Sequence, residues 1–211
     1  MFYFVKTPGW LKKLYRQYVW NFTPSSKTIY LSFDDGPHPK ATPFVLNELN
    51  KYKAKATFFC IGKNVAAFQN IYNEIITEGH SIGNHTFNHL NGWETENYVY
   101  IDNISKAGIH IHSNLFRPPY GRIKRSQAKL LRSVYPGIKI IMWSVLSGDF
   151  DLNISKEKCL SNVIKNAESG SVIVFHDSEK AFDNLIYTLP KVLEYFSKKG
   201  FVFEKISAAM I

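Results

Sequence analysis

The amino-acid sequence predicts an α/β fold: a distorted or incomplete (β/α) barrel with about seven parallel strands, in a single domain. Short apolar, β-branched runs alternate with longer segments of helical periodicity, which indicates parallel strands joined by crossover helices. The expected strands cover residues 28–33, 56–60, 81–83, 115–117, 138–143, 171–175 and 200–204. The expected helices cover residues 41–52, 64–78, 95–108, 124–134, 155–168 and 182–199. Seven strands in roughly 180 residues suit a small barrel better than two domains.

Composition narrows the class of protein further. The chain has 211 residues, of which 45% are hydrophobic and 20% charged, with 12 Gly, 9 Pro and 2 Cys. These values are typical of a globular domain and argue against disordered, collagen-like and disulfide-scaffold proteins.

The formal net charge of +9 favours anionic surroundings. Because Lys and Arg are scattered rather than gathered in a stripe, we expect no nucleic-acid partner. We also expect a monomer, with Cys60 and Cys159 as buried thiols.

Residues 1–26 form a basic, amphipathic segment ahead of the domain expected over residues 27–211. After Pro8, apolar residues recur at helical spacing: Trp10, Leu11, Leu14, Tyr15, Tyr18, Val19 and Phe22. We favour a helix that packs its apolar side on the domain. The alternative is that residues 1–22 lie on an anionic membrane surface. The segment lacks the features of a secretory signal, so the default expectation is a cytoplasmic or peripheral membrane location.

Polar clusters occur where several of the expected strands end. They are Asp34-Asp35-Gly36-Pro37, His85 to His89, Arg117 to Gly121, Asp149, and His176-Asp177. In parallel α/β folds, catalytic groups converge at the carboxyl ends of the strands. Polar residues that only face solvent would be scattered over both the amino and the carboxyl ends of the strands. The pattern therefore predicts a functional site.

The Asp-Asp pair and the two histidines suggest a metal site. Side chains of Asp34 and Asp35 start on opposite faces of the strand unless the turn that follows redirects one of them. The pair makes sense if one carboxylate binds a metal and the other accepts a proton; the alternative is an Asp that caps the turn. His85 and His89 have the spacing that places two imidazoles on one side of a helical turn. Two His and one carboxylate are a common ligand set for a catalytic metal.

Three further positions carry chemistry of their own. Arg117 can orient a carboxylate and keep it ionised. Because two prolines follow it, the next available backbone amide is that of Tyr120, which could hold an oxyanion; the alternative is a plain turn with Tyr120 in the core. His176 can act as a general acid if a carboxylate such as Asp149 holds its tautomer. The remaining histidines receive no catalytic role: His38, His80, His110 and His112.

The order of these motifs resembles the polysaccharide deacetylase family, the carbohydrate esterases with a NodB homology domain. Phe-Asp-Asp-Gly-Pro, His-x-x-x-His, Arg-Pro-Pro-Tyr-Gly, a late Asp and apolar-His-Asp follow one another between Phe33 and Asp177. The resemblance covers the chain from about residue 27 to its end. It implies a distorted β/α barrel and a divalent metal, most commonly Zn²⁺, with Co²⁺, Ni²⁺ or Mn²⁺ as alternatives. The metal ligands it implies are Asp35, His85 and His89.

The resemblance also implies a role for each remaining motif residue. Asp34 is the expected catalytic base, and Arg117 is the residue that tethers it. Tyr120 provides the backbone amide that supports the oxyanion. Asp149 is the expected partner of the catalytic histidine, and His176 is the general acid.

The function implied is metal-dependent removal of N-acetyl groups from an amino-sugar glycan, such as peptidoglycan or a chitin-like polymer. Four positions depart from the family pattern and change the expected pocket wall: Leu90, Leu146, Phe150 and Phe175. Two alternatives stay open. One is a deformylase or deacetylase of a lipid-linked amino sugar at a membrane surface. The other is a carbohydrate-binding relative without catalytic activity.

Overall fold

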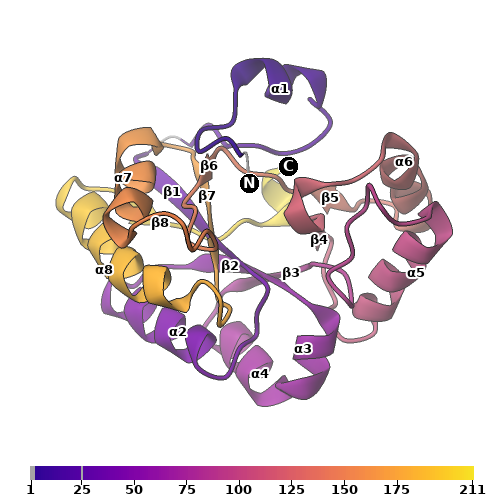
Figure 1. Cartoon of the computed structure of the whole chain (residues 1–211), viewed down its shortest axis with the longest axis horizontal. Coiled ribbons are helices and arrows are strands. Elements are labelled where there is room, and N and C mark those ends of the chain that lie inside the picture. Colours follow the sequence, from indigo (N-terminus) through magenta and orange to yellow (C-terminus); the bar gives the residue numbers. More distant parts are fainter. Residues whose placement is uncertain (1–2, 25) are drawn as a thin grey trace.

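Figure 1 shows the computed structural model of the chain, in which a parallel sheet curls into a half-barrel with helices around its outside. The structure describes residues 3–24 and 26–211. Along the sheet the strands follow the order β5-β4-β3-β2-β1-β7-β6, and β8 pairs with the start of β1. The pairs between these strands are parallel, as crossover helices require. The predicted fold class is confirmed.

The strands are short except at the centre of the sheet. They are β1 (Thr28–Asp34), β2 (Ala56–Cys60), β3 (Ser81–Asn84), β4 (Leu115–Phe116), β5 (Lys139–Ile140), β6 (Val145–Leu146), β7 (Val172–His176) and β8 (Val202–Phe203). Every residue of β1 is buried. Phe33 of β1 stacks against Phe58 and Phe175 of the two neighbouring strands, with ring centroids 5.1 and 6.0 Å away. This packing fixes the carboxyl ends of β1, β2 and β7 relative to one another.

The helices from α2 onward surround the sheet, while α1 stands apart from it (Figure 1). The helices are α1 (Gly9–Leu14), α2 (Ala41–Lys51), α3 (Gly62–Ala67), α4 (Gln69–Thr77), α5 (Asn97–Gly108), α6 (Arg125–Val134), α7 (Lys156–Asn166) and α8 (Phe182–Lys198), with 3₁₀ turns η1 (Pro119–Gly121) and η2 (Ala208–Met210). The single helix predicted over residues 64–78 was wrong. It is divided at Phe68, whose φ of −128° and ψ of 51° lie outside the helical region. Cys60 and Cys159 are free, buried thiols, as expected.

The strand predicted over residues 138–143 is the second correction. Only Lys139–Ile140 belongs to β5, and the separate strand β6 was not predicted. The chain leaves the sheet between them because its carbonyl groups bond elsewhere. The Ile141 and Met142 carbonyls accept hydrogen bonds from the side chain of Arg117. For these two carbonyl groups, a buried cation takes the place of a strand partner.

The N-terminal segment packs on the domain, but the helix expected through Phe22 was wrong. The helix α1 ends at Leu14, and the chain around Val19 is extended. The Val19 N–H donates to the Ile140 carbonyl at 2.9 Å, and the Met142 N–H donates to the Val19 carbonyl at 2.7 Å. Pairing with an open strand edge therefore outweighs the helical periodicity of residues 15–22.

The side of the N-terminal segment that faces solvent is α1 itself. The helix has no buried residue, and Trp10 and Leu14 are more than half exposed. Figure 1 shows α1 standing off the barrel beside the strands β5 and β6. Within the described part of the chain, no helix has both the length and the apolar character to cross a membrane. Contact of this segment with an anionic membrane surface stays a prediction.

Two tryptophans of the N-terminal segment test how it packs. Trp20 is 7% exposed, packs with Tyr18 and Met142, and donates its indole N–H to the Tyr15 carbonyl. We expect Trp20→Ala to lower the free energy of unfolding by about 3–5 kcal/mol, as for other buried aromatic truncations. The control Trp10→Ala should change it by less than about 0.5 kcal/mol, because Trp10 is 62% exposed. Urea unfolding followed by circular dichroism measures both; equal effects would contradict the packing described.

Candidate active site

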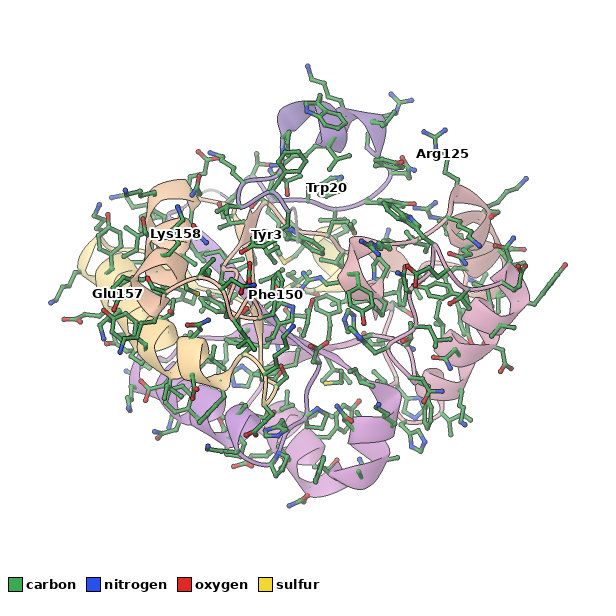
Figure 2. All side chains as sticks on the ribbon, in the orientation of Figure 1. Tyr3, Trp20, Arg125, Phe150, Glu157 and Lys158 are labelled. Carbon is green, nitrogen blue, oxygen red and sulfur yellow. The ribbon has the colours of Figure 1, made fainter. Side chains whose placement is uncertain are left out.

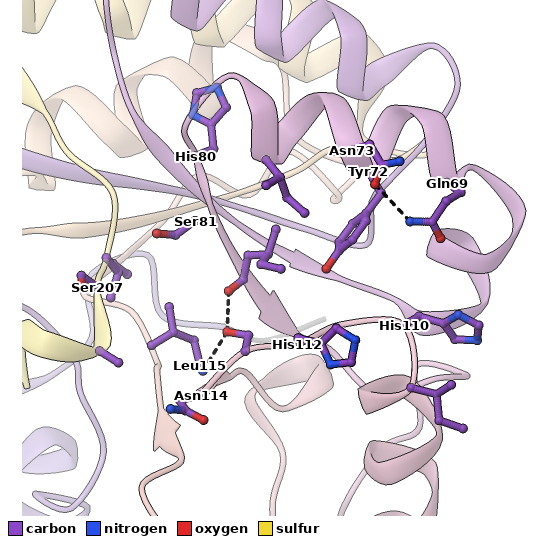
Figure 3. A pocket seen from close by; sticks show the side chains of 16 residues that line it. Gln69, Tyr72, Asn73, His80, Ser81, His110, His112, Asn114, Leu115 and Ser207 are labelled. Carbon is purple, nitrogen blue, oxygen red and sulfur yellow. Dashed lines mark hydrogen bonds between the residues drawn. The ribbon is translucent and has the colours of Figure 1, made fainter.

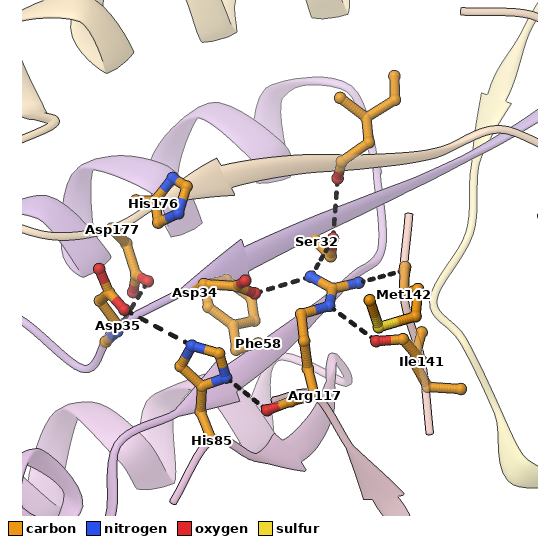
Figure 4. Close-up of polar contacts among 12 residues, drawn as sticks. Ser32, Asp34, Asp35, Phe58, His85, Arg117, Ile141, Met142, His176 and Asp177 are labelled. Atoms are coloured by element: carbon orange, nitrogen blue, oxygen red, sulfur yellow. Dashed lines mark hydrogen bonds and ion pairs between the residues drawn. The ribbon is translucent and has the colours of Figure 1, made fainter. Parts of the chain in front are cut away.

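Five of the predicted site residues are seen together at the carboxyl ends of the strands in Figure 4: Asp34, Asp35, His85, Arg117 and His176. Asp34 ends β1, His176 ends β7, and the two are directly opposite each other in the register of these neighbouring strands. His85 follows β3, and Arg117 follows β4. Side chains from distant parts of the sequence thus share one edge of the sheet, as parallel topology requires.

Arg117 is completely buried and holds Asp34. Its Nη1 donates to Asp34 Oδ1 at 2.7 Å and to Ser32 Oγ at 2.8 Å. The other guanidinium nitrogens reach two backbone carbonyls, Ile141 at 3.1 Å and Met142 at 3.0 Å. Burial lowers the pKa of Arg117, and the negative charge of Asp34 opposes that shift. These acceptors offset the cost of burying the charge of Arg117 and fix its side chain in place. The carboxylate of Asp34 is therefore held in one orientation.

The donor atoms of Asp35, His85 and His89 lie within 4.8 Å of one another. Asp35 Oδ1 is 3.1 Å from His89 Nε2 and 3.7 Å from His85 Nε2. Burial alone would raise the pKa of the Asp35 carboxyl, but the imidazoles of His89, His176 and His85 hold it well below its usual range. The predicted ligand set is therefore assembled in space, with its carboxylate ionised.

The tautomer of His85 suits metal binding. Its Nδ1 donates to the Arg117 carbonyl at 2.7 Å, which leaves the lone pair on Nε2, the atom that faces Asp35. Burial lowers the pKa of His85 to about 4, so the ring is neutral, as a ligand must be.

Asp35 supplies an independent test of whether a cation fits this site. Its Oδ1 atom is buried and accepts no well-formed hydrogen bond. A buried carboxylate oxygen without such a partner is costly unless a cation lies beside it. The residues present therefore fit a divalent metal ion.

The loop from His85 to His89 is not the helical turn that the spacing predicted. Thr86 and His89 have φ of 63° and 57°, in the left-handed region. The Asn103 side chain, from α5, accepts hydrogen bonds from the backbone N–H groups of Phe87 and Asn88, both at 2.9 Å. The two imidazole rings still meet, with centroids 5.1 Å apart, because this bent loop returns His89 to His85.

The turn after β1 separates the two adjacent carboxylates. Asp35 has a φ of 80°, which turns its side chain away from that of Asp34.

Asp177 holds the peptide that follows Asp35. The Gly36 N–H donates to Asp177 Oδ1 at 3.1 Å, and Thr42 Oγ1 donates to Asp177 Oδ2 at 2.5 Å. A Cβ atom at Gly36 would lie 2.1 Å from Asp177 Oδ2, so only glycine fits there. Burial raises the pKa of Asp177 to about 8.

Tyr120 stands at the rim of the site rather than in the core. It is 53% exposed, and its ring centroid lies 4.6 Å from that of His89. The interpretation of a plain turn with Tyr120 buried was wrong. Its φ of 60° places it in the left-handed region, within the 3₁₀ turn η1. The side chain at this position therefore lies beside a metal-ligand candidate.

Asp149 and His176 form a two-point contact. His176 Nδ1 bonds Asp149 Oδ1 at 2.8 Å, and the His176 backbone N–H donates to Asp149 Oδ2 at 2.7 Å. Ser147 Oγ also donates to Asp149 Oδ1, at 2.9 Å. Burial alone would lower the pKa of His176, but the charges of Asp149, Asp35 and Asp34 raise it to about 9. The ring is thus a cation at neutral pH, with its Nδ1 proton directed at Asp149.

Sequence reasoning missed three residues that hold the site: Ser32, Asn103 and Asp177. Ser32 carried a usable signal, since it is a polar residue in the otherwise apolar strand β1. Asp177 is the last residue of the apolar-His-Asp motif, but no function was predicted for it. Asn103 gave no signal, because its partners are backbone groups of a distant loop.

A hollow of about 710 Å³ opens at the amino ends of β3 and β4 (Figure 3). His80, His110 and His112 line it, and no carboxylate does. His80 is buried, and its Nδ1 accepts the Ala56 N–H at 3.2 Å, which is the structural role expected for it. The chemistry of the site lies at the opposite ends of the strands, so this hollow is separate from it.

Known proteins are similar to this chain in both sequence and fold. A peptidoglycan-N-acetylglucosamine deacetylase of Bacillus cereus is 34% identical over 196 residues, which cover 90% of this chain and 91% of the relative. A chitooligosaccharide deacetylase of Azorhizobium caulinodans is 34% identical over 165 residues, covering 74% and 76%. The solved Bc1960 peptidoglycan N-acetylglucosamine deacetylase superposes with a TM-score of 0.82 at 30% identity, covering 95% of each chain. The family model of the polysaccharide deacetylases matches residues 22–135. The chain belongs to the polysaccharide deacetylase family.

Proposed function

We propose that this protein removes N-acetyl groups from amino sugars of a glycan, such as peptidoglycan or a chitin-like polymer, in a metal-dependent hydrolysis that releases acetate. The observation that carries the proposal is the separation of two adjacent carboxylates. Asp34 faces the buried cation of Arg117, whereas Asp35 faces two imidazoles. One site therefore combines a proton acceptor with a metal-ligand set. The names of the relatives, which specify peptidoglycan and chitooligosaccharide, support this class of substrate.

Asp35 Oδ1, His85 Nε2 and His89 Nε2 would hold the divalent cation. Two imidazoles and one carboxylate suit zinc, and imidazole also accepts cobalt, nickel or manganese. When bound, such an ion would supply a Lewis acid that polarises a water molecule and the acetyl carbonyl.

Asp34 would act as the general base. Arg117 donates a hydrogen bond to one carboxylate oxygen of Asp34 and holds that carboxylate in one orientation. The carboxylate can then accept a proton from the water that attacks the carbonyl carbon. Tyr120 would donate its backbone N–H to the oxygen on which negative charge develops.

His176 would complete the reaction as general acid. The contact with Asp149, which raises the pKa of His176 to about 9 in the metal-free protein, favours the imidazolium form. Since Asp149 occupies the Nδ1 side, the Nε2–H is left to protonate the amide nitrogen. The C–N bond then breaks, and the products are acetate and a free amino sugar. The full set of base, acid and ligand candidates favours an enzyme over a relative that only binds carbohydrate.

Acetate release tests the function and its metal dependence. We expect the protein to release acetate from N-acetylglucosamine oligomers or peptidoglycan, to lose activity with a chelator, and to regain it with zinc or cobalt. His85→Ala should lower kcat/KM at least about 100-fold, because the neutral imidazole ligand is lost. The control His112→Ala lies in the separate hollow and should retain activity. Turnover that survives chelation would contradict the proposal; formate released only from a lipid-linked amino sugar would favour the alternative substrate.

The charge on His176 gives a pH prediction. In metal-free protein we expect the ring to titrate near pH 9 and the ring of His80 near pH 4. Because the folded pKa of His176 is raised above its unfolded value of about 6.5, the Asp149–His176 pair stabilises the fold fully below that value. The contribution is lost as the pH rises through about 9. Asp149→Asn should lower the titration midpoint of His176, measured by NMR. An unchanged midpoint would contradict the assigned partnership.

A further inference from the structure

We propose that Tyr3 is a positioning residue for His176, acting through Phe150, so that the N-terminal segment is part of the active site. This inference rests on the proposed function of His176 as general acid. The Tyr3 ring lies 5.3 Å from the Phe150 ring, and the Phe150 ring lies 5.1 Å from that of His176, both as centroid distances. Figure 2 shows Tyr3 beside Phe150, next to the strands of the barrel.

A hydrogen bond adds a second contact to the same loop. The Tyr3 hydroxyl donates to Asp151 Oδ2 at 3.1 Å. Burial, together with this carboxylate, raises the pKa of Tyr3 to about 12. Residues 149–151 are consecutive: Asp149 bonds His176, while the next two residues contact Tyr3. Tyr3 therefore holds the part of the loop that holds the imidazole.

The backbone directs Tyr3 to this place. Lys6 pairs antiparallel with Val145 of β6. The Leu146 N–H donates to the Val5 carbonyl at 2.8 Å, and the Thr7 N–H donates to the Ser144 carbonyl at 2.9 Å. Because the segment runs antiparallel to β6, its first described residues reach the carboxyl end of that strand, where Asp149 follows.

Gly148 provides the space that the Tyr3 hydroxyl requires. It has a φ of 82°, and a Cβ atom there would lie 2.9 Å from that hydroxyl oxygen. Residues 147–155, between β6 and α7, contain no helix or strand. A loop without regular structure depends on contacts from other segments for its position. Tyr3 supplies two such contacts, one to the ring of Phe150 and one to the carboxylate of Asp151.

The proposal has a kinetic consequence. A proton donor displaced by about 1 Å can lose a factor of about 100 in rate without loss of substrate binding. We expect Tyr3→Ala to lower kcat about 10- to 100-fold and to change KM for an N-acetylglucosamine oligomer less than about twofold. Tyr3→Phe keeps the ring and should recover most of the activity. The control Tyr98→Ala removes a tyrosine that is 81% exposed on α5 and should leave kcat unchanged.

A double-mutant cycle separates positioning from a general effect on stability. If Tyr3 acts through Phe150, then Tyr3→Ala should have no further effect on kcat in a Phe150→Ala background. Additive losses in the double variant would overturn the proposal, as would a Tyr3→Phe variant as slow as Tyr3→Ala. Circular dichroism at the assay temperature verifies that each variant is folded.

An NMR measurement tests the inference without turnover. The ring of Phe150 lies against His176, so its displacement should shift the Cε1–H resonance of His176, assigned with His176→Gln. We expect Tyr3→Ala to move this resonance and Tyr98→Ala to leave it unchanged. A resonance that Tyr3→Ala does not move would overturn the proposal even if the wild-type protein is active. An inactive wild-type protein in which the resonance moves would instead contradict only the proposed function.

Discussion

The buried guanidinium of Arg117 is the constraint on which the rest of the site depends. A charge without solvent is tolerated only if an opposite charge and enough acceptors surround it. Asp34 provides the charge, and Ser32 and two carbonyl groups after β5 complete the set. The Arg117 carbonyl in turn accepts the Nδ1 proton of His85. One residue thus links the proposed base, a metal-ligand candidate and the course of the chain beyond β5.

The second organising feature is the turn after β1. Neighbouring side chains of a strand point to opposite faces, yet both Asp34 and Asp35 serve the same site. The left-handed conformation of Asp35 makes this arrangement possible, and Asp177 holds the next peptide in place. Two carboxylates of the same chemical type therefore have different neighbours. One pairs with a fixed cation, and the other faces two imidazoles that can share a metal with it.

The sequence correctly predicted the strands whose burial and ends are determined by a short local stretch of residues. The strands β1, β2 and β7 are apolar runs bounded by polar motifs, and their predicted limits differ from the structure by one residue at most. The site residues followed from them, because parallel strands bring their carboxyl ends together. The strand β6, the extended chain around Val19 and the bent loop before His89 are decided by distant partners. Local periodicity carries no information about Arg117 capping the Ile141 carbonyl or Asn103 holding the loop at Phe87.

The division of roles between Asp34 and Asp35 is the central claim, and zinc binding to metal-depleted protein tests it most directly. Calorimetric titration should show one zinc ion bound to the wild-type chain. Asp35→Asn should weaken binding more than about 100-fold, because a ligand is lost. Asp34→Asn, shown to be folded by circular dichroism, should bind zinc within about tenfold of wild type and yet release no acetate. Loss of zinc binding in Asp34→Asn, with binding retained in Asp35→Asn, would contradict the account.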